Sequence, residues 1–344
     1  MTQQRYDRQR RFAPIGDEGQ QRIEAATVLV IGVGALGSVA AEVLARAGVG
    51  RLRIVDRDTV EWSNLQRQSL YTEADAREGL AKVHAAAARL GEINSEIRIE
   101  PIAADVTAAN IEGLFAGVDL VVDGTDNFDI RMLINDVALE TGTPWVHGGC
   151  LGASGQVFLF DPGRTICFRC LVPSVPDPTS VATCDQAGVL GSATHVVASL
   201  QANEALKYLA AGAAAATPKI QTLDLWEGRF RSLDPSDLRS GECRACDLGH
   251  RDFLHRRGGV TEPVVLCGRN AVQLPPPAED RVLDLSAMSR LWEGLGETQV
   301  NRFLARLQID PTRSITLFRD GRAVINGTED AAEAKTLYAR FVGS

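Results

Sequence analysis

Short apolar segments alternate with longer amphipathic segments between residues 27 and 150. The short segments have the length of buried strands, whereas the longer ones repeat their apolar positions every three or four residues, as helices do. Strands are predicted at 27–31, 52–55, 97–102, 119–123 and 144–147, and helices at 36–46, 78–93, 107–115 and 128–141. Strands separated by helices form βαβ units, so we expect an α/β fold with a Rossmann-like, mainly parallel sheet.

The pattern becomes mixed after residue 150 and breaks near residue 250. We divide the chain into a first domain over 1–250, a polar linker over 251–262 and a small C-terminal α/β domain over 263–344. A ferredoxin-like fold is our expectation for the last domain. The remaining predicted elements are strands at 155–160, 219–224, 264–266 and 271–274, helices at 18–25, 189–210, 286–295 and 330–341, and a hairpin over 314–325 that turns on Asp320 and Gly321.

Composition excludes several classes of protein. Of 344 residues, 45% are hydrophobic and 23% are charged, which is ordinary for a globular protein, and the net charge of −8 argues against a dedicated nucleic-acid binder. No apolar run reaches the roughly eighteen residues that a membrane span needs. The N-terminus is polar and lacks an apolar signal core, so we expect a cytoplasmic protein. In a reducing compartment, cysteines are more often metal ligands or catalysts than disulfides.

A glycine-rich turn joins the first predicted strand to the first predicted helix. Gly32, Gly34 and Gly37 form a GxGxxG motif, which allows a tight turn and a close approach of phosphate to the backbone. Asp56 ends the next strand about twenty residues later, where it can bind a ribose hydroxyl. This combination predicts a nucleotide site but does not specify the nucleotide.

Two CxxC pairs predict a structural zinc site. Cys167 with Cys170, and Cys243 with Cys246, supply four thiolates for a closed tetrahedral centre. Such a centre stabilises the fold and has no open coordination position for catalysis. The alternative is that the pairs are redox-active, but neither pair opens a helix after a strand.

Several polar residues near the glycine motif suit a triphosphate. Asn64 and Arg67 could reach the phosphates of ATP from the loop that begins at Ser63, and Lys82 could do the same. Asp126 could hold Mg²⁺, which binds phosphates through one or two carboxylates. Each residue also has an ordinary alternative: a surface arginine, an exposed helical lysine, and an aspartate that caps the following helix.

These motifs occur together and in order, and they resemble the ThiF/MoeB/HesA family, the bacterial relatives of ubiquitin-activating enzymes. The resemblance covers about residues 5–246. Its motifs are RYDRQ at 5–9, GVGALG at 32–37, DRDTVEWSNLQRQ at 56–68, GTDN at 124–127, SLQANEALK at 199–207 and the two CxxC pairs. Many members have glycine where this chain has Ala35, and the spacing from Arg67 to Lys82 is slightly longer than in MoeB.

The resemblance implies an adenylating enzyme. The family binds ATP and Mg²⁺, and it joins AMP to the C-terminal glycine of a small ubiquitin-like sulfur carrier (ThiS or MoaD type) that ends in Gly-Gly, before thiocarboxylate formation. Carried over to this chain, Asp56 binds the ribose, Ala35 presents its backbone, and Asp126 organises Mg²⁺ beside Asn127. The implied phosphate contacts are Ser63, Asn64, Arg67 and Lys82. Arg8 is expected to reach the site of a partner subunit, which implies a homodimer.

Cys184 and the C-terminal domain are less constrained by the resemblance. Cys184 follows a proline-rich loop and either forms a covalent link with the carrier or is a bystander thiol. The C-terminal domain lacks a rhodanese-like cysteine loop, so we expect a separate sulfur donor, either a desulfurase or a rhodanese-like protein. The carrier and its pathway (thiamin, molybdopterin, cysteine or tRNA thiolation) stay open.

Two other functions explain part of the sequence. An NAD-dependent oxidoreductase accounts for the glycine motif and Asp56 but gives no role to Arg67, Lys82 or the cysteine pairs. A non-catalytic binding module with the same fold would not need Asp56, Arg67, Lys82 and Asp126 together.

Overall fold

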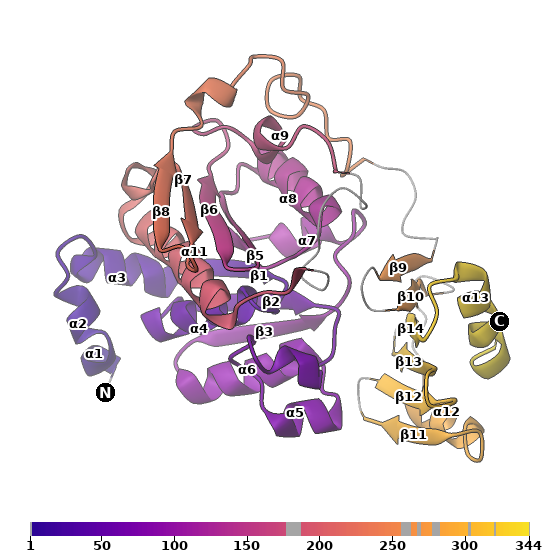
Figure 1. The fold of residues 1–344 in the computed structure, drawn as a ribbon. Coiled ribbons are helices and arrows are strands. Elements are labelled where there is room, and N and C mark those ends of the chain that lie inside the picture. The colour runs from indigo at the N-terminus through magenta and orange to yellow at the C-terminus, as the bar shows by residue number, and fades with distance from the viewer. Residues whose placement is uncertain are drawn as a thin grey trace. The chain divides into compact units, whose positions relative to one another are not determined.

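The computed structural model describes residues 2–176, 187–255, 263–266, 270–276, 283–301, 304–319 and 321–343 (Figure 1). The chain divides into two compact units, Met1–Arg257 and Gly258–Ser344, and each is described by itself. Cys184, Cys267, Asp320 and residues 256–262 of the predicted linker lie outside the described residues.

The first unit contains an eight-stranded sheet in the order β3-β2-β1-β4-β5-β6-β7-β8. The first five strands along the chain run parallel, and the last three pair antiparallel, which confirms the mainly parallel sheet. The strands are β1 (Thr27–Ile31), β2 (Arg51–Asp56), β3 (Arg98–Ala103), β4 (Leu120–Asp123), β5 (Trp145–Leu151), β6 (Ser154–Phe160), β7 (Ile220–Asp224) and β8 (Arg229–Leu233).

Helices cover both faces of this sheet. Every residue of β1 is buried, and its side chains alternate: Leu29 and Ile31 pack in the core that holds α8, whereas Val30 faces the start of α4. On the α4 face lie α3 (Gly16–Ala25), α4 (Gly37–Ala47), α6 (Lys82–Ile93) and α11 (Gly191–Ala211). On the other lie α7 (Ile111–Phe115), α8 (Phe128–Thr141) and α9 (Phe168–Leu171). The short helices α1 (Thr2–Arg5), α2 (Asp7–Arg10) and α5 (Glu73–Glu78) lie at the surface.

The prediction of one helix over 78–93 was wrong. Gly79 adopts φ +58° and ends α5, and Leu80 and Ala81 then pair with the loop after β2 before α6 begins at Lys82. A left-handed residue cannot continue a helix, so the break follows from Gly79 itself. Lys82 therefore stands at the first position of a helix.

The second unit contains a six-stranded antiparallel sheet in the order β11-β12-β13-β14-β10-β9. Trp292, Leu307 and Leu317 lie in the core between this sheet and its two helices. The elements are β9 (Val264–Leu266), β10 (Ala271–Leu274), α12 (Leu285–Leu291), β11 (Glu297–Val300), β12 (Leu304–Gln308), β13 (Ser314–Phe318), β14 (Ala323–Asn326) and α13 (Ala331–Phe341).

The ferredoxin-like expectation needs correction. That fold has the element order βαββαβ, whereas the described elements here follow the order ββαββββα. The reason is that β11 to β14 form an antiparallel meander, with no helix among the described residues that connect them. Among the described helices of both units, none is long and apolar enough to cross a bilayer.

Candidate functional site

The glycine turn after β1 packs directly against two other segments. Gly32 adopts φ +81°, and a Cβ added at Gly37 or at Gly124 would overlap its carbonyl oxygen. The start of α4 and the loop after β4 can therefore meet this turn only because both positions are glycine.

The start of α4 offers free backbone donors. Within the described part of the chain, the N–H groups of Gly34, Ala35, Leu36 and Gly37 have no acceptor. They belong to the N-terminus of an eleven-residue helix. Unpaired N–H groups at such a terminus favour an anion.

Asp56, at the carboxyl end of β2, holds the glycine turn in place. One carboxylate oxygen accepts the Val33 N–H at 2.7 Å, and the other accepts the Asp58 N–H at 2.8 Å. Burial raises the pKa of Asp56 above its usual value, although the charge of Lys82 opposes the shift. The half-buried carboxylate is thus an anchor of the turn as well as a candidate ligand-binding group.

Lys82 is buried, with 4% of its side chain exposed, and its Nζ lies 3.1 Å from the Asp58 carboxylate. Its backbone N–H donates to the Asp58 carbonyl at 3.0 Å. The interpretation of Lys82 as an exposed helical lysine was therefore wrong. The helix start brings its ammonium group to the acidic loop after β2.

The loop after Ser63 packs against the same turn. Asn64 is buried and its Oδ1 accepts the Glu61 N–H at 3.0 Å, whereas Arg67 is half-buried and donates to the Ser63 carbonyl at 2.9 Å. Ser63 itself is exposed. Gln68 is buried beside Gly34, and its Oε1 has no hydrogen-bond partner among the described residues.

A buried ionic network fixes the loop after β4. Asp123 is fully buried and accepts hydrogen bonds from Arg131 Nε at 3.0 Å, His147 Nδ1 at 2.9 Å and Thr125 N at 2.9 Å. Burial alone would raise the pKa of Asp123, but Arg131 and His147 outweigh it and hold the pKa below its usual value. Arg131 also donates to the Thr125 carbonyl, which fixes the loop on both sides.

Asp126 stands at the exposed tip of this loop, and none of the described residues pairs with its carboxylate. The helix-capping alternative for Asp126 was wrong, because Asn127 caps α8 through a hydrogen bond from the Ile130 N–H at 3.3 Å. The carboxylate of Asp126 is therefore available to a cation.

Arg8 is not brought to this site by its own chain. It is exposed on α2, two residues after Tyr6, which packs against Gly48 at the C-terminal end of α4. The glycine turn lies at the other end of α4, which spans about 16 Å for eleven residues.

The four cysteines of the two CxxC pairs lie together in the structure. In sequence they are remote from the residues of the glycine turn. Their Sγ atoms all lie within 4.8 Å of one another, with Cys167 3.8 Å from Cys170 and 3.6 Å from Cys243. Tetrahedral zinc with Zn–S bonds of about 2.3 Å separates its sulfurs by about 3.8 Å. Burial and the neighbouring thiols raise the pKa of Cys167 to about 12, so four thiolates require a cation. The sulfur separations fit zinc and are much longer than the roughly 2.05 Å bond of a disulfide.

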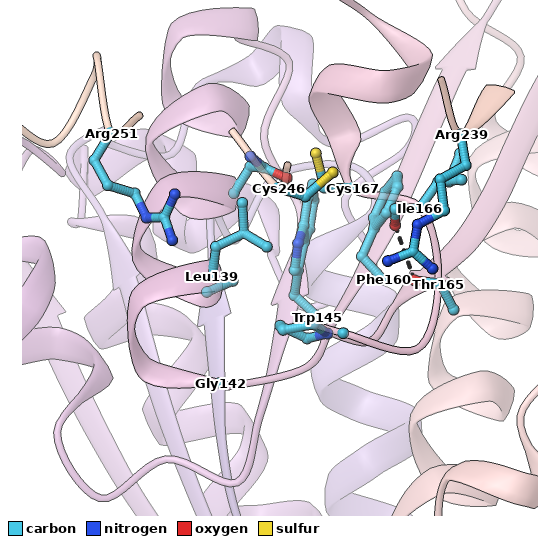
Figure 2. A pocket seen from close by; sticks show the side chains of 14 residues that line it. Leu139, Gly142, Trp145, Phe160, Thr165, Ile166, Cys167, Arg239, Cys246 and Arg251 are labelled. Atoms are coloured by element: carbon cyan, nitrogen blue, oxygen red, sulfur yellow. Dashed lines mark hydrogen bonds between the residues drawn. The ribbon is translucent and has the colours of Figure 1, made fainter. Parts of the chain in front are cut away.

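A cavity of about 350 Å³ adjoins the cluster (Figure 2). Cys167 and Cys246 line it, and Arg239 and Arg251 extend towards it from opposite sides. The aromatic ring of Trp145 lies between them. Arg251 is held there by an ion pair with Glu140 at 3.3 Å and a hydrogen bond to the Ala245 carbonyl at 2.9 Å.

Comparison with known proteins decides the family. Residues 6–245 match the ThiF family. The chain belongs to the ThiF family. The resemblance to the ThiF/MoeB/HesA family is thereby confirmed.

Individual relatives extend the match. The sulfur carrier protein ThiS adenylyltransferase of Bacillus subtilis is 41% identical over 98% of this chain and 99% of its own length. A sulfur carrier protein adenylyltransferase of Thermus thermophilus is 40% identical over 70% of this chain and 90% of its own length. A crystal structure of Escherichia coli MccB with MccA-N7isoASN shares the fold, with a TM-score of 0.60, 24% identity, and coverage of 70% of this chain and 74% of MccB.

Residues missed by the sequence interpretation hold this site together. Tyr71, Asp123 and Arg131 lie outside the motifs named above, and Asp58 and Gln68 lie within the 56–68 motif without an assigned role. Asp58 pairs with Lys82, Tyr71 with Val33, and Arg131 with Asp123. Only their place beside motif residues could have drawn attention to them.

We predict that His147 makes stability depend on pH. Burial, together with Arg131, lowers its pKa below 6.5 although Asp123 opposes the shift, so the folded protein keeps His147 neutral. As the pH falls below 6.5, the unfolded chain takes up a proton that the folded chain does not. The free energy of unfolding should therefore fall as the pH drops below 6.5, by at most about 1.4 kcal/mol per pH unit, until His147 is also protonated in the folded state.

Urea denaturation between pH 5 and 8 measures this slope. His147→Gln should flatten it, whereas His250→Gln, which removes an exposed imidazole, should not. An unchanged slope in His147→Gln would contradict the assignment.

Proposed function

We propose that this protein is an adenylyltransferase that activates the C-terminal glycine of a ubiquitin-like sulfur carrier of the ThiS type. The observation that carries the proposal is the match to the Bacillus ThiS adenylyltransferase along 98% of the chain, which includes the C-terminal unit. The Thermus relative, whose name does not specify a carrier, matches only 70% of the chain. Because the full-length match is to a ThiS adenylyltransferase, we favour a ThiS-type carrier.

The reaction brings two anions together. The carrier carboxylate attacks the α-phosphorus of ATP, the bond to pyrophosphate breaks, and an acyl-adenylate forms on the carrier. The carboxylate is already ionised near neutral pH, so no general base is needed. Catalysis then depends on positioning and on positive charge that stabilises the transition state.

The residues of the site fit ATP. The free N–H groups of Gly34, Ala35 and Gly37 suit phosphate oxygens. Asp56 keeps lone pairs for the ribose hydroxyls after accepting two N–H groups. The proposed phosphate contacts are Ser63, Asn64, Arg67 and Lys82.

Mg²⁺ is proposed to bind Asp126, with Asn127 beside it. The carboxylate of Asp126 is exposed and has no partner among the described residues, which suits an ion that keeps most of its ligands from phosphate and water. When bound, the ion would neutralise phosphate charge. An oxidoreductase would give neither Asp126 nor the buried Lys82 a role, so we do not favour it.

Zinc is proposed to join Cys167, Cys170, Cys243 and Cys246 as a structural centre. The sulfur separations support this assignment, and all four coordination positions would be filled by protein. The centre would fasten the segment after β8 to the start of α9.

The working enzyme is proposed to be a homodimer in which Arg8 serves the partner's site. Its distance from the glycine turn along α4 supports an action across subunits. The sulfur donor is proposed to be a separate desulfurase or rhodanese-like protein. Cys184 keeps its two open roles, a covalent link to the carrier or none.

The first test is pyrophosphate exchange into ATP. We expect exchange that depends on adding a ThiS-type carrier ending in Gly-Gly, and a fall of at least about 100-fold in Asp126→Ala, because a charge-stabilising group is lost. Asp129→Ala, an exposed neighbour on α8, is the matched control and should keep most activity. Exchange that is absent in the wild type would refute the proposed function.

The zinc centre is tested by metal analysis and thermal unfolding. Cys243→Ser should lose its zinc and melt about 10 °C lower, since a cross-link worth several kcal/mol disappears. Cys150→Ser removes a cysteine outside the cluster and should keep the metal. Full zinc content in Cys243→Ser would reject the assignment.

The homodimer is tested by mixing two inactive variants. Arg8→Ala and Asp126→Ala should each be inactive alone. After subunit exchange, roughly half of the dimers are hybrids, and each hybrid keeps one intact site, so about a quarter of wild-type activity should return. If Arg8 acts within its own chain, hybrids contain no intact site and no activity returns.

A further inference from the structure

Tyr71 contacts the glycine turn, although it lies outside the sequence motifs described above. The side chain is buried, with 6% exposed, and its hydroxyl donates to the Val33 carbonyl at 2.6 Å. The Val33 N–H donates to Asp56 at 2.7 Å. Val33 is thus held at both its N–H and its carbonyl by side chains from two other parts of the chain.

The hydrogen bond from Tyr71 to the Val33 carbonyl also orients the N–H group of Gly34. The Val33 carbonyl and the Gly34 N–H belong to one planar trans peptide, so they point in opposite directions. A carbonyl fixed on Tyr71 therefore aims the Gly34 N–H away from Tyr71. Within the described residues that N–H has no acceptor.

The glycine turn needs such an anchor. Glycine has more backbone freedom than any other residue, so the peptide between Val33 and Gly34 could rotate at little cost without an outside contact. A donor that rotates freely must be ordered when a phosphate binds, which weakens binding. A fixed donor avoids this loss.

Tyr71 also belongs to the segment that carries Arg67. Gln68 and Leu70, which lie between them, are buried, and the Gln68 amide nitrogen lies 3.9 Å from the position of a Cβ on Gly34. The half-buried Arg67 and the turn are therefore linked by a short, packed stretch of chain.

The hydroxyl stays protonated under all working conditions. Burial raises the pKa of Tyr71 well above 10, and the nearby charges of Asp56 and Asp58 raise it further. The hydrogen bond to Val33 therefore does not depend on pH in the neutral range.

We propose that Tyr71 is a positioning residue of the nucleotide site, which fixes the Gly34 N–H towards the phosphates and ties the turn to the Arg67 segment. The inference rests on the proposed function, because it assumes that a nucleotide binds there. Tyr71 does not itself touch the nucleotide.

The test compares two variants that each remove one tyrosine hydroxyl. Tyr71→Phe deletes the bond to the Val33 carbonyl, and Tyr338→Phe deletes a bond of the same type to the Gly321 carbonyl in the C-terminal unit. We expect the KM for ATP to rise about tenfold in Tyr71→Phe alone, with the KM for the carrier unchanged. Amide hydrogen exchange of residues 32–37 should accelerate in Tyr71→Phe alone.

The outcomes separate the two proposals. Wild-type protein without carrier-dependent exchange refutes the proposed function whatever Tyr71 does. If the wild type is active, an equal KM for ATP in Tyr71→Phe and Tyr338→Phe overturns the positioning role and leaves the proposed function intact. An equal rise in both KM values would also overturn it, because it would indicate a general loss of structure.

Discussion

The close approach around the Gly32 carbonyl controls the architecture of the site. Gly37 and Gly124 leave no side chain between the turn after β1, the start of α4 and the loop after β4. Free N–H groups from one segment and the Asp126 loop from another can therefore face a single ligand. A methyl group at either glycine would force these segments apart. The charged groups of the site can therefore come together only because both positions lack a side chain.

Buried charge then fixes what the glycines allow. Asp123 has no contact with water, and an unpaired carboxylate there would cost several kcal/mol. Arg131 and His147 supply its partners from α8 and β5, so the loop that carries Asp126 is held by elements on both sides. The tip of this loop, which carries Asp126, is exposed.

The sequence allowed prediction wherever a contact is local or periodic. The strand, turn and helix around Gly32 follow from apolar spacing, and the cysteine pairs follow from their own spacing. The helix start at Lys82 was missed because Gly79 breaks an otherwise continuous helical pattern. Tyr71 and Val33 lie 38 positions apart, and no local pattern connects them. β8 is exposed throughout, so no buried apolar run marked it.

The balance of charge around the turn explains why the proposed site needs help from outside. Asp56, Asp58, Asp105 and Asp126 bring four carboxylates, against the three cations Arg57, Arg67 and Lys82. Arg57 already pairs with Asp105, and Lys82 with Asp58. A triphosphate and a carrier carboxylate would meet net repulsion there. Mg²⁺ on Asp126 and an arginine from a second subunit would reverse it. The exposed position of Arg8, at the far end of α4 from its own turn, is what such an arrangement requires.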